Sequence, residues 1–379
     1  MAALERSERS PLEVGAVREL SALGQSVWLD SLARRMLYSG ALEALMQGDG
    51  VTGASLDVPA FERGGTMPIS TTDTRDAQIR LVDDARAAAD LLRPIHESTG
   101  GRDGFVSVPL STAARDTSAL VAEARTLWTR VERQNVLVRI PATNPGVAAI
   151  RTLTEAGINV HATLVFGRFR YAHVANAYIT GLRSRAARGL ALDRVASVAS
   201  MCLSPIDALV DPQLETMAGL GSEKAVELLG KAAIAEARRT YARYRDLFHG
   251  ENGSSSCGEL GELVGQGARP QRLMWTKMGL KCLKYVEALV EPDTIVELSL
   301  DMVEAYRKLG HPDLRPARSI ADAALTAAKL AALGLGSRDI EMLLETEEIE
   351  HGVASSEKSF AALNPEFARS IPTADRMLG

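Results

Sequence analysis

The sequence predicts an α/β fold, a (β/α)8 TIM barrel with additional C-terminal helices. Strand-like and helix-like segments alternate along the chain, which is typical of a parallel sheet with crossover helices. Eight segments have strand character, and 379 residues is a length that α/β barrels reach as one unit. We therefore expect a flexible tail over residues 1–12 and one barrel domain with a helical cap over residues 13–379.

One strand–helix–strand unit is especially clear. Residues 136–140 are apolar or β-branched apart from one charge, and Thr143 or Asn144 can cap the helix that follows. Gly157 ends this helix, and a second strand follows at once over residues 158–166. Two strands joined by a crossover helix lie parallel in one sheet, so this unit sets the topology of the predicted barrel.

The other elements follow in chain order. Strands are expected at residues 25–30, 51–55, 104–110, 195–203, 271–276 and 294–298. Helices are expected at residues 13–22, 31–46, 73–97 (as one helix or two), 116–131, 169–182, 230–248, 317–333, 337–344 and 355–363. Residues 250–270 are rich in glycine and serine, which predicts a mobile loop.

Composition narrows the class of protein. The net charge of -5 is spread over both signs, without the basic stripe that nucleic acid or a membrane surface would require. No apolar run approaches the ~18 residues of a membrane span. Three cysteines lie far apart, which predicts neither a disulfide framework nor a zinc site. The N-terminus is polar rather than a signal peptide, so we expect a cytoplasmic protein.

The sequence of the strand–helix–strand unit at residues 136–166 is also similar to that of a known family. It contains Leu-Val-Arg-Ile-Pro-Ala-Thr at residues 137–143, Gly-Ile-Asn at 157–159 and Thr-Leu-Val-Phe at 163–166. This run resembles, without gaps, the transaldolase family, whose members carry [LM]-[IV]-K-I-P-A-T, a Gly-Ile-Asn turn and a Thr-Leu-[IVL]-Phe strand. Shorter matches extend the resemblance over about residues 25–350. It implies a transaldolase-like barrel that acts on sugar-like substrates.

The register of the resemblance places Arg139 where the family keeps the lysine that forms a Schiff base with the donor ketose. A Schiff base needs a primary amine that can become neutral, and a guanidinium stays protonated and is a poor nucleophile. The resemblance therefore implies that the family's covalent chemistry cannot run from this strand. The alternative is that Arg139 is a solvated charge at a strand end.

Three further positions are expected at the catalytic end. By the resemblance, Asp30 keeps an aspartate that acts in proton transfer, although it could instead cap the next helix. Thr163 keeps a threonine that helps hold the catalytic water, while His161 replaces an active-site asparagine. His161 could equally be a hydrogen-bonded structural residue. Pro109 falls where the family has its acid/base glutamate, so that role is absent from the strand.

The expected substrate-binding positions also depart from the family. Its phosphate-binding serine and arginine are replaced here by Gly167 and Ala172, while Arg168 and Arg170 stand nearby. The loss of a bidentate arginine implies that a phosphate is bound differently or not at all. Arg168 could restore an anion site or be an ordinary surface residue. Asp57 stands in the family's Asn-Pro turn and adds a carboxylate near the mouth.

Two lysines complete the candidate site. Lys277 shares the alternation of Leu273 and Trp275 at the end of a predicted strand, and we expect it to point into the mouth. The Arg139 cation and partial burial would lower its pKa there, as a nucleophilic amine requires. The alternative is a solvated lysine in a loop. Lys281 matches a lysine common in the family and is expected at the rim of the substrate site or in a structural role.

The leading hypothesis is a divergent enzyme that makes or breaks a carbon–carbon bond, or isomerises or dehydrates, in a polyhydroxylated carbonyl compound of specialised metabolism. The histidines form no metal-binding pair, so we expect neither a metal nor another cofactor. The rival is an inactive homologue that binds a ligand or partner through the old cavity. Ordinary transaldolase activity is disfavoured by the changed residues. Family members often pair, which allows a homodimer.

Overall fold

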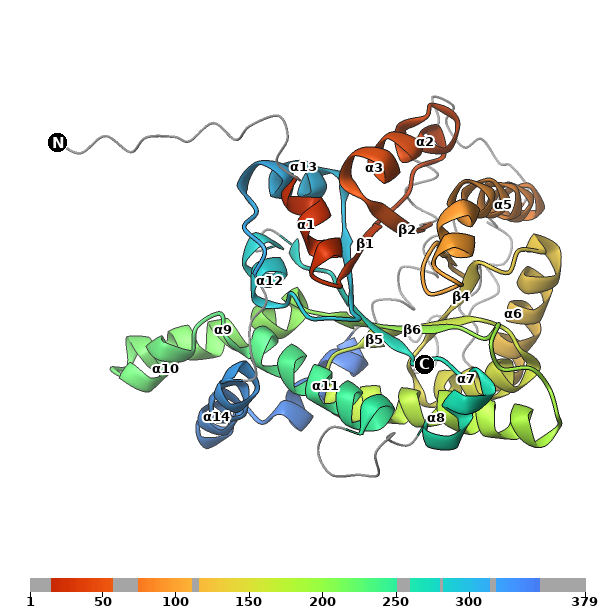
Figure 1. Ribbon diagram of the computed structural model, residues 1–379. Helices are drawn as coiled ribbons and strands as arrows, with labels where there is room; N and C mark the ends of the chain where they lie inside the picture. Colours follow the sequence, from red (N-terminus) through yellow and green to blue (C-terminus); the bar gives the residue numbers. More distant parts are fainter. Residues whose placement is uncertain are drawn as a thin grey trace, which may run out of the picture.

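A computed structural model describes residues 15–56, 74–110, 116–250, 260–279, 282–313 and 318–347. Eight parallel strands close into a barrel in chain order, and helices surround them (Figure 1). The strands are β1 (Ser26–Leu29), β2 (Val51–Ser55), β3 (Val106–Val108), β4 (Val136–Pro141), β5 (Val160–Val165), β6 (Ser197–Cys202), β7 (Arg272–Thr276) and β8 (Ile295–Leu298). The predicted fold class is confirmed.

The helices that the structure describes cover the outside of this barrel. They are α1 (Ala16–Ala22), α2 (Arg34–Tyr38), α3 (Ala41–Asp49), α5 (Thr74–Ser98), α6 (Thr117–Val131), α7 (Asn144–Ala156), α8 (Arg168–Ala187), α9 (Ser204–Gly219), α10 (Glu223–Leu228), α11 (Ala232–His249), α12 (Cys282–Ala288), α13 (Leu300–Leu309), α14 (Arg318–Ala332) and a last helix, Ser337–Glu347. A 3-10 helix, Gly261–Gln266, lies within the segment expected as a loop.

Several boundaries differ from the prediction. The helix expected at residues 31–46 is two helices, because Gly40 adopts a left-handed φ of 78° between α2 and α3. The segment at residues 73–97 is the single helix α5, although it contains Pro94. Helices α9, α10, α12 and α13 were not predicted. The expected tail and the expected helix at residues 355–363 lie outside the described residues.

Local capping explains the central unit. Thr143 is the N-cap of α7, and its Oγ1 accepts a hydrogen bond from the Gly146 amide at 3.2 Å. Gly157 closes the same helix with a φ of 82°, a conformation that favours glycine. Both signals were visible in the sequence. They direct the chain from β4 into β5 and so place the ends of these two strands side by side.

No single helix among the described segments is long and apolar enough to cross a membrane. Two consecutive helices, Ile320–Ala332 and Ser337–Glu347, meet the length and composition criteria only as a pair that is bent by 79°.

The barrel has two separate cores. The larger one lies between the strands and the helical shell, and it includes the outward-facing Val138, Ala162 and Leu298. The smaller one fills the lower barrel interior with Trp28, Phe105, Leu137, Ala196, Val198, Met274 and Ile295. Since the lower interior is packed solid, any ligand must enter at the opposite end, where the carboxyl ends of the strands meet.

The packing around Trp28 gives a test of this interior. A Cβ added at Gly53 would lie 2.4 Å from the Trp28 ring, so Gly53→Ala should destabilise the protein by roughly 1–3 kcal/mol through overpacking. Gly48 in α3 has nothing within 4 Å of an added Cβ. The same substitution there should be neutral or stabilising by about 0.5–1 kcal/mol. Urea unfolding of both variants makes the comparison, and equal destabilisation would contradict the packing described here.

Candidate active site

Above the apolar core, each strand contributes one polar residue to the barrel interior, which for β1 is the residue directly after the strand. Strand alternation places them one step beyond the inward-facing apolar residues, at the carboxyl ends. In strand order they are Asp30, Ser55, Ser107, Arg139, His161, Ser200, Thr276 and Glu297. We call these eight residues the polar ring. Most of them are buried, so their charges and hydrogen bonds act in a setting that excludes water.

Three members of the polar ring form a chain of hydrogen bonds across β4, β3 and β5. Arg139 Nε donates to Ser107 Oγ at 3.0 Å, and Ser107 Oγ lies 2.6 Å from His161 Nδ1. A guanidinium can only donate, so the Ser107 oxygen accepts from it and the Ser107 proton is left for His161. This order makes Nδ1 an acceptor and leaves the His161 proton on Nε2.

The surroundings of His161 keep it neutral. The residue is 2 % exposed, and burial followed by the nearby Arg139 charge lowers its pKa well below the usual value. Its Nε2 is buried and has no hydrogen-bond partner among the described residues. A buried donor without an acceptor is costly, so this N–H is prepared to meet an oxygen atom of a ligand or a water molecule. His161 is therefore arranged as a neutral donor rather than as a base.

A carboxyl group lies in the same ring. Glu297 accepts hydrogen bonds from Ser55 through Oε1 and from Thr276 through Oε2, the latter at 2.5 Å. Burial is the main cause that raises the pKa of Glu297 to about 7, and the Asp30 charge adds to it while Arg139 opposes it. A carboxyl group with such a pKa can both accept and release a proton near neutral pH.

The remaining sequence-predicted residues of the catalytic end lie around this ring. Asp30 follows β1 directly and is not the cap of α2, whose N-cap is Ala33. The structure therefore removes the alternative role considered for Asp30. Thr163 is partly buried, lies two residues beyond His161 on the same side of β5, and pairs with Pro141 of β4. Together with the ring, these residues form a single polar mouth.

The strand pattern that predicted Lys277 in the mouth does not support that position. Leu273 and Trp275, whose alternation it shares, face outward, and the Trp275 indole donates to the Leu289 carbonyl at 3.1 Å. Lys277 itself is exposed, and its backbone turns with a φ of 50° at the end of β7. The alternation of β7 therefore gives no support to a lysine that points into the mouth. Asp57 and Lys281 lie outside the described residues.

The predicted phosphate-end residues lie at the start of α8. Gly167 is its buried N-cap, Arg168 is 4.0 Å from Glu236, and Arg170 forms an ion pair with Glu345 at 2.5 Å. These two arginines are thus engaged with carboxylates of the same chain.

Sequence reasoning missed five of the eight members of the polar ring, including Glu297. A signal was present, because Glu297 is the one charged residue in the apolar run 295–298. A charge inside a strand that is covered on both faces requires a partner or a function. Ser55, Ser107 and Thr276 gave no comparable signal, since serine and threonine are common in strands and loops alike.

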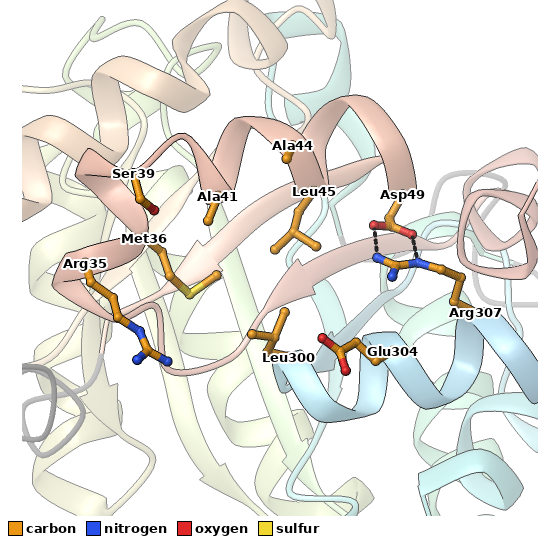
Figure 2. Close-up of a pocket in the computed structure, with 10 residues that line it drawn as sticks. All are labelled: Arg35, Met36, Ser39, Ala41, Ala44, Leu45, Asp49, Leu300, Glu304 and Arg307. Carbon is orange, nitrogen blue, oxygen red and sulfur yellow. Dashed lines mark hydrogen bonds and ion pairs between the residues drawn. The ribbon is translucent and has the colours of Figure 1, made fainter.

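A groove of about 430 Å³ lies elsewhere, on the outside of the barrel (Figure 2). It runs between α2 and α3 on one side and α13 on the other, over an apolar floor that includes Met36, Leu45 and Leu300. A bidentate pair between Asp49 and Arg307, at 2.6 and 2.8 Å, closes one end. No residue of the polar ring lines this groove. Among the described residues, no group of three or more His, Cys, Asp or Glu could hold a metal ion.

A closed (β/α)8 barrel with acid, base and hydroxyl groups at the carboxyl ends of its strands defines a class of enzymes that work at this end. The family follows from comparison with known proteins. Residues 65–364 match the Transaldolase/Fructose-6-phosphate aldolase family. The chain belongs to this family, as the resemblance of its strands suggested.

Relatives match almost the whole chain. A transaldolase of Thiobacillus denitrificans is 37 % identical over 364 residues, which is 91 % of this chain and 98 % of the relative. Transaldolase 1 of Streptomyces coelicolor is 36 % identical over 378 residues, covering 94 % and 95 %. A transaldolase of Thermobifida fusca is 35 % identical over 367 residues, covering 90 % and 95 %. The matches support an aldolase-like transferase that acts on a small sugar-like molecule.

The Glu297 carboxyl makes a prediction about stability. Its pKa is raised from an ordinary value near 4.5 to about 7, so the folded state holds a proton that the unfolded state releases. The resulting stabilisation is complete below pH 4.5 and is lost as the pH rises to about 7. Between pH 4.5 and 8, the difference in unfolding free energy between Glu297→Gln and wild type should shift in favour of the variant by about 3 kcal/mol. The exposed Glu304→Gln should show no such trend in urea titrations.

The state of His161 can be checked directly. ¹⁵N chemical shifts and long-range couplings of the imidazole should show a neutral ring protonated at Nε2 at pH 6, because burial opposes the charged form. In Ser107→Ala the hydrogen bond to Nδ1 is absent. The preference for one tautomer should weaken there while the ring stays neutral. A charged imidazolium in wild type at pH 6 would contradict the arrangement.

Proposed function

We propose that this chain is a transaldolase-family enzyme that forms an enolate from a polyhydroxylated carbonyl substrate without a strand-borne Schiff base. The reaction would be the transfer or cleavage of a carbon–carbon unit, or a related isomerisation or dehydration. It would belong to specialised metabolism. Aldol cleavage, isomerisation and dehydration of such compounds share this intermediate. One observation carries the proposal: none of the eight strands contains a lysine, and the first lysine of the chain, Lys224, follows β6. An imine cannot then start from any strand.

In this proposal Arg139 is the cation that stabilises negative charge on the substrate. The step that an imine would assist is the build-up of negative charge on the former carbonyl oxygen. A fixed cation in a dry site stabilises that charge without prior reaction. Arg139 uses Nε to hold Ser107, which leaves its terminal nitrogens to face the oxygen. The neutral His161 N–H is a second donor in the same ring, so the two residues together would form an oxyanion site.

Glu297 supplies the proton transfers in this proposal, with Asp30 beside it. In the cleavage direction, the Glu297 carboxylate accepts the proton of the hydroxyl group β to the carbonyl. The electrons of that O–H bond form a new carbonyl, the carbon–carbon bond breaks, and its electron pair becomes the enolate held by Arg139. The protonated Glu297 then returns the proton to the enolate carbon. Its pKa of about 7 suits both directions. Thr163 would hold the substrate hydroxyl or a water molecule at the rim.

Ordinary transaldolase activity is a second candidate, and one observation favours it: the relatives that match nearly all of the chain are named transaldolases. It would require an imine on a lysine beyond the strands, and Lys277 was the residue considered for it. The outward alternation of β7 around Lys277 speaks against that route. A third alternative, a homologue that only binds a ligand or partner, shares the fold without turnover.

Hydrogen exchange tests enolate formation without knowledge of the final product. Wild type incubated in D₂O with fructose, other free ketoses and aldoses, and fructose 6-phosphate should exchange the proton next to a carbonyl, followed by NMR. Glu297→Gln should slow this exchange by about 10²–10⁴-fold, as removal of an acid/base group does. Arg139→Met should slow it by about 10²–10³-fold. Glu304→Gln, outside the site, should leave it unchanged.

Borohydride trapping separates the candidates. Wild type should give no covalent sugar adduct in the mass of the intact chain, whereas Arg139→Lys puts a primary amine on β4 and should allow trapping. An adduct on wild type, together with transfer of a three-carbon unit between sugar phosphates, would establish the ordinary activity instead. Absence of exchange with every carbonyl compound would leave the binding-only homologue.

A further inference from the structure

We propose that the substrate of this site carries no phosphate, because carboxylates of the chain itself fill the anion-binding end of α8. This inference rests on the proposed function and adds the class of substrate, an unphosphorylated polyhydroxylated carbonyl compound. The key residues are Glu236 of α11 and Glu341 of the last helix.

Helix α8 begins where an anionic end of a substrate would be expected. Its first residue, Arg168, lies three positions after the end of β5 and five positions after Thr163, so the helix starts at the catalytic end of the barrel. The first amides of a helix have no partner within it and carry a partial positive charge. A free helix start at this place would bind a phosphate.

This helix start is not free. The Arg168 amide donates to Glu236 Oε1 at 3.1 Å, and the Arg170 amide donates to Glu341 Oε1 at 2.6 Å. Glu236 and Glu341 are 6 % and 3 % exposed. An anion from the solvent therefore cannot take the place of either carboxylate unless this part of the structure opens. Gly167 makes room for them: a Cβ there would lie 2.9 Å from Glu341 and 3.0 Å from Glu236.

The arginines next to these carboxylates are also engaged in ion pairs or hydrogen bonds. Arg239 donates to Glu236 Oε2 at 2.9 Å, and Arg168 lies 4.0 Å from the other oxygen of that carboxylate. Arg170 forms a fork with Glu345, with its Nε 2.7 Å from Oε1. Three arginines thus face three glutamates, including Glu341, so each of these cations already lies beside a carboxyl group of the chain itself. Burial, and the adjacent Glu236 charge, raise the pKa of Glu341 to about 7.

Four other helices that begin at the catalytic end carry an oxygen ligand in the same way, whereas α2 and α9 have no side-chain cap. Among the described residues, Asp116 caps α6, Thr143 caps α7, and Ser299 caps α13, each by accepting a backbone N–H. Asp207 accepts from the Ala233 amide near the start of α11. Each of these helix starts therefore carries an oxygen ligand of its own, and α6 and α11 carry a negative one.

The mouth itself favours a neutral substrate. Arg139 is the cation of the polar ring, and it faces the carboxyl groups of Asp30 and Glu297. A phosphate dianion brought to Arg139 would approach both carboxyl groups and pay for like-charge repulsion. Hydroxyl groups meet no such barrier, because they can accept a hydrogen bond from the His161 N–H and donate one to a carboxyl group of the ring.

Inorganic phosphate is the direct probe, and calorimetric titration at constant ionic strength is the measurement. Wild type should show no saturable phosphate binding up to about 10 mM. Glu341→Ala frees the Arg170 amide, removes a negative charge and should gain saturable binding at least ten-fold tighter than wild type. The control, Glu304→Ala, changes an exposed glutamate of α13 and should gain none. Comparison at matched ionic strength removes the general stabilisation of proteins by phosphate.

A second measurement on wild type guards against a variant that fails to fold. Fructose 6-phosphate should not bind more tightly than fructose in the same calorimeter. Saturable phosphate binding by wild type, tighter binding of the phosphorylated sugar, or a folded Glu341→Ala that gains no phosphate site would each overturn the inference. These arms need no turnover, so they remain decisive if hydrogen exchange fails and the proposed function with it.

Discussion

The closed barrel is the constraint on which the site depends. Once eight parallel strands join edge to edge, every second residue of each strand must enter one shared interior. The lower half of that interior is filled by the side chains of Trp28 and its apolar neighbours. The polar ring lies directly above, and its low exposure follows from closure. Burial is in turn the main cause that raises the pKa of Glu297 and lowers that of His161.

A single arginine links the two halves of the ring. Through Ser107, Arg139 fixes which nitrogen of His161 accepts a hydrogen bond, and its charge opposes protonation of both His161 and Glu297. Arg139 therefore helps to set the protonation state in which His161 and Glu297 act. His161 is left as a neutral donor, and Glu297 has a pKa near neutrality instead of far above it. Replacement of Arg139 would change charge, tautomer and acidity together, so its effects cannot be divided among the three.

The fold was predictable from sequence because capping and alternation are local. The caps at Thr143 and Gly157 are where the residues suggested. Alternation groups residues by face but does not say which face is inward, so the face of Leu273 and Trp275 was taken as inward although both residues face outward. Contacts across the chain left no local trace. Glu341 meets the Arg170 amide from 171 positions away, and Glu297 meets Ser55 from 242. These partners could not be read from the sequence, although the lone charge of Glu297 in an apolar strand was a visible signal.

The absence of lysine from the strands and the filled start of α8 have a common consequence for binding. A phosphate supplies binding energy far from the reacting carbon, and an enzyme can use that energy to orient the carbonyl. Without such a handle, orientation must come from hydrogen bonds close to the reaction. A permanently charged Arg139 and a fixed His161 N–H hold the carbonyl oxygen from two sides, which limits its rotation. The ring can thus provide by preorganised polar contacts what a distant anion site would otherwise provide.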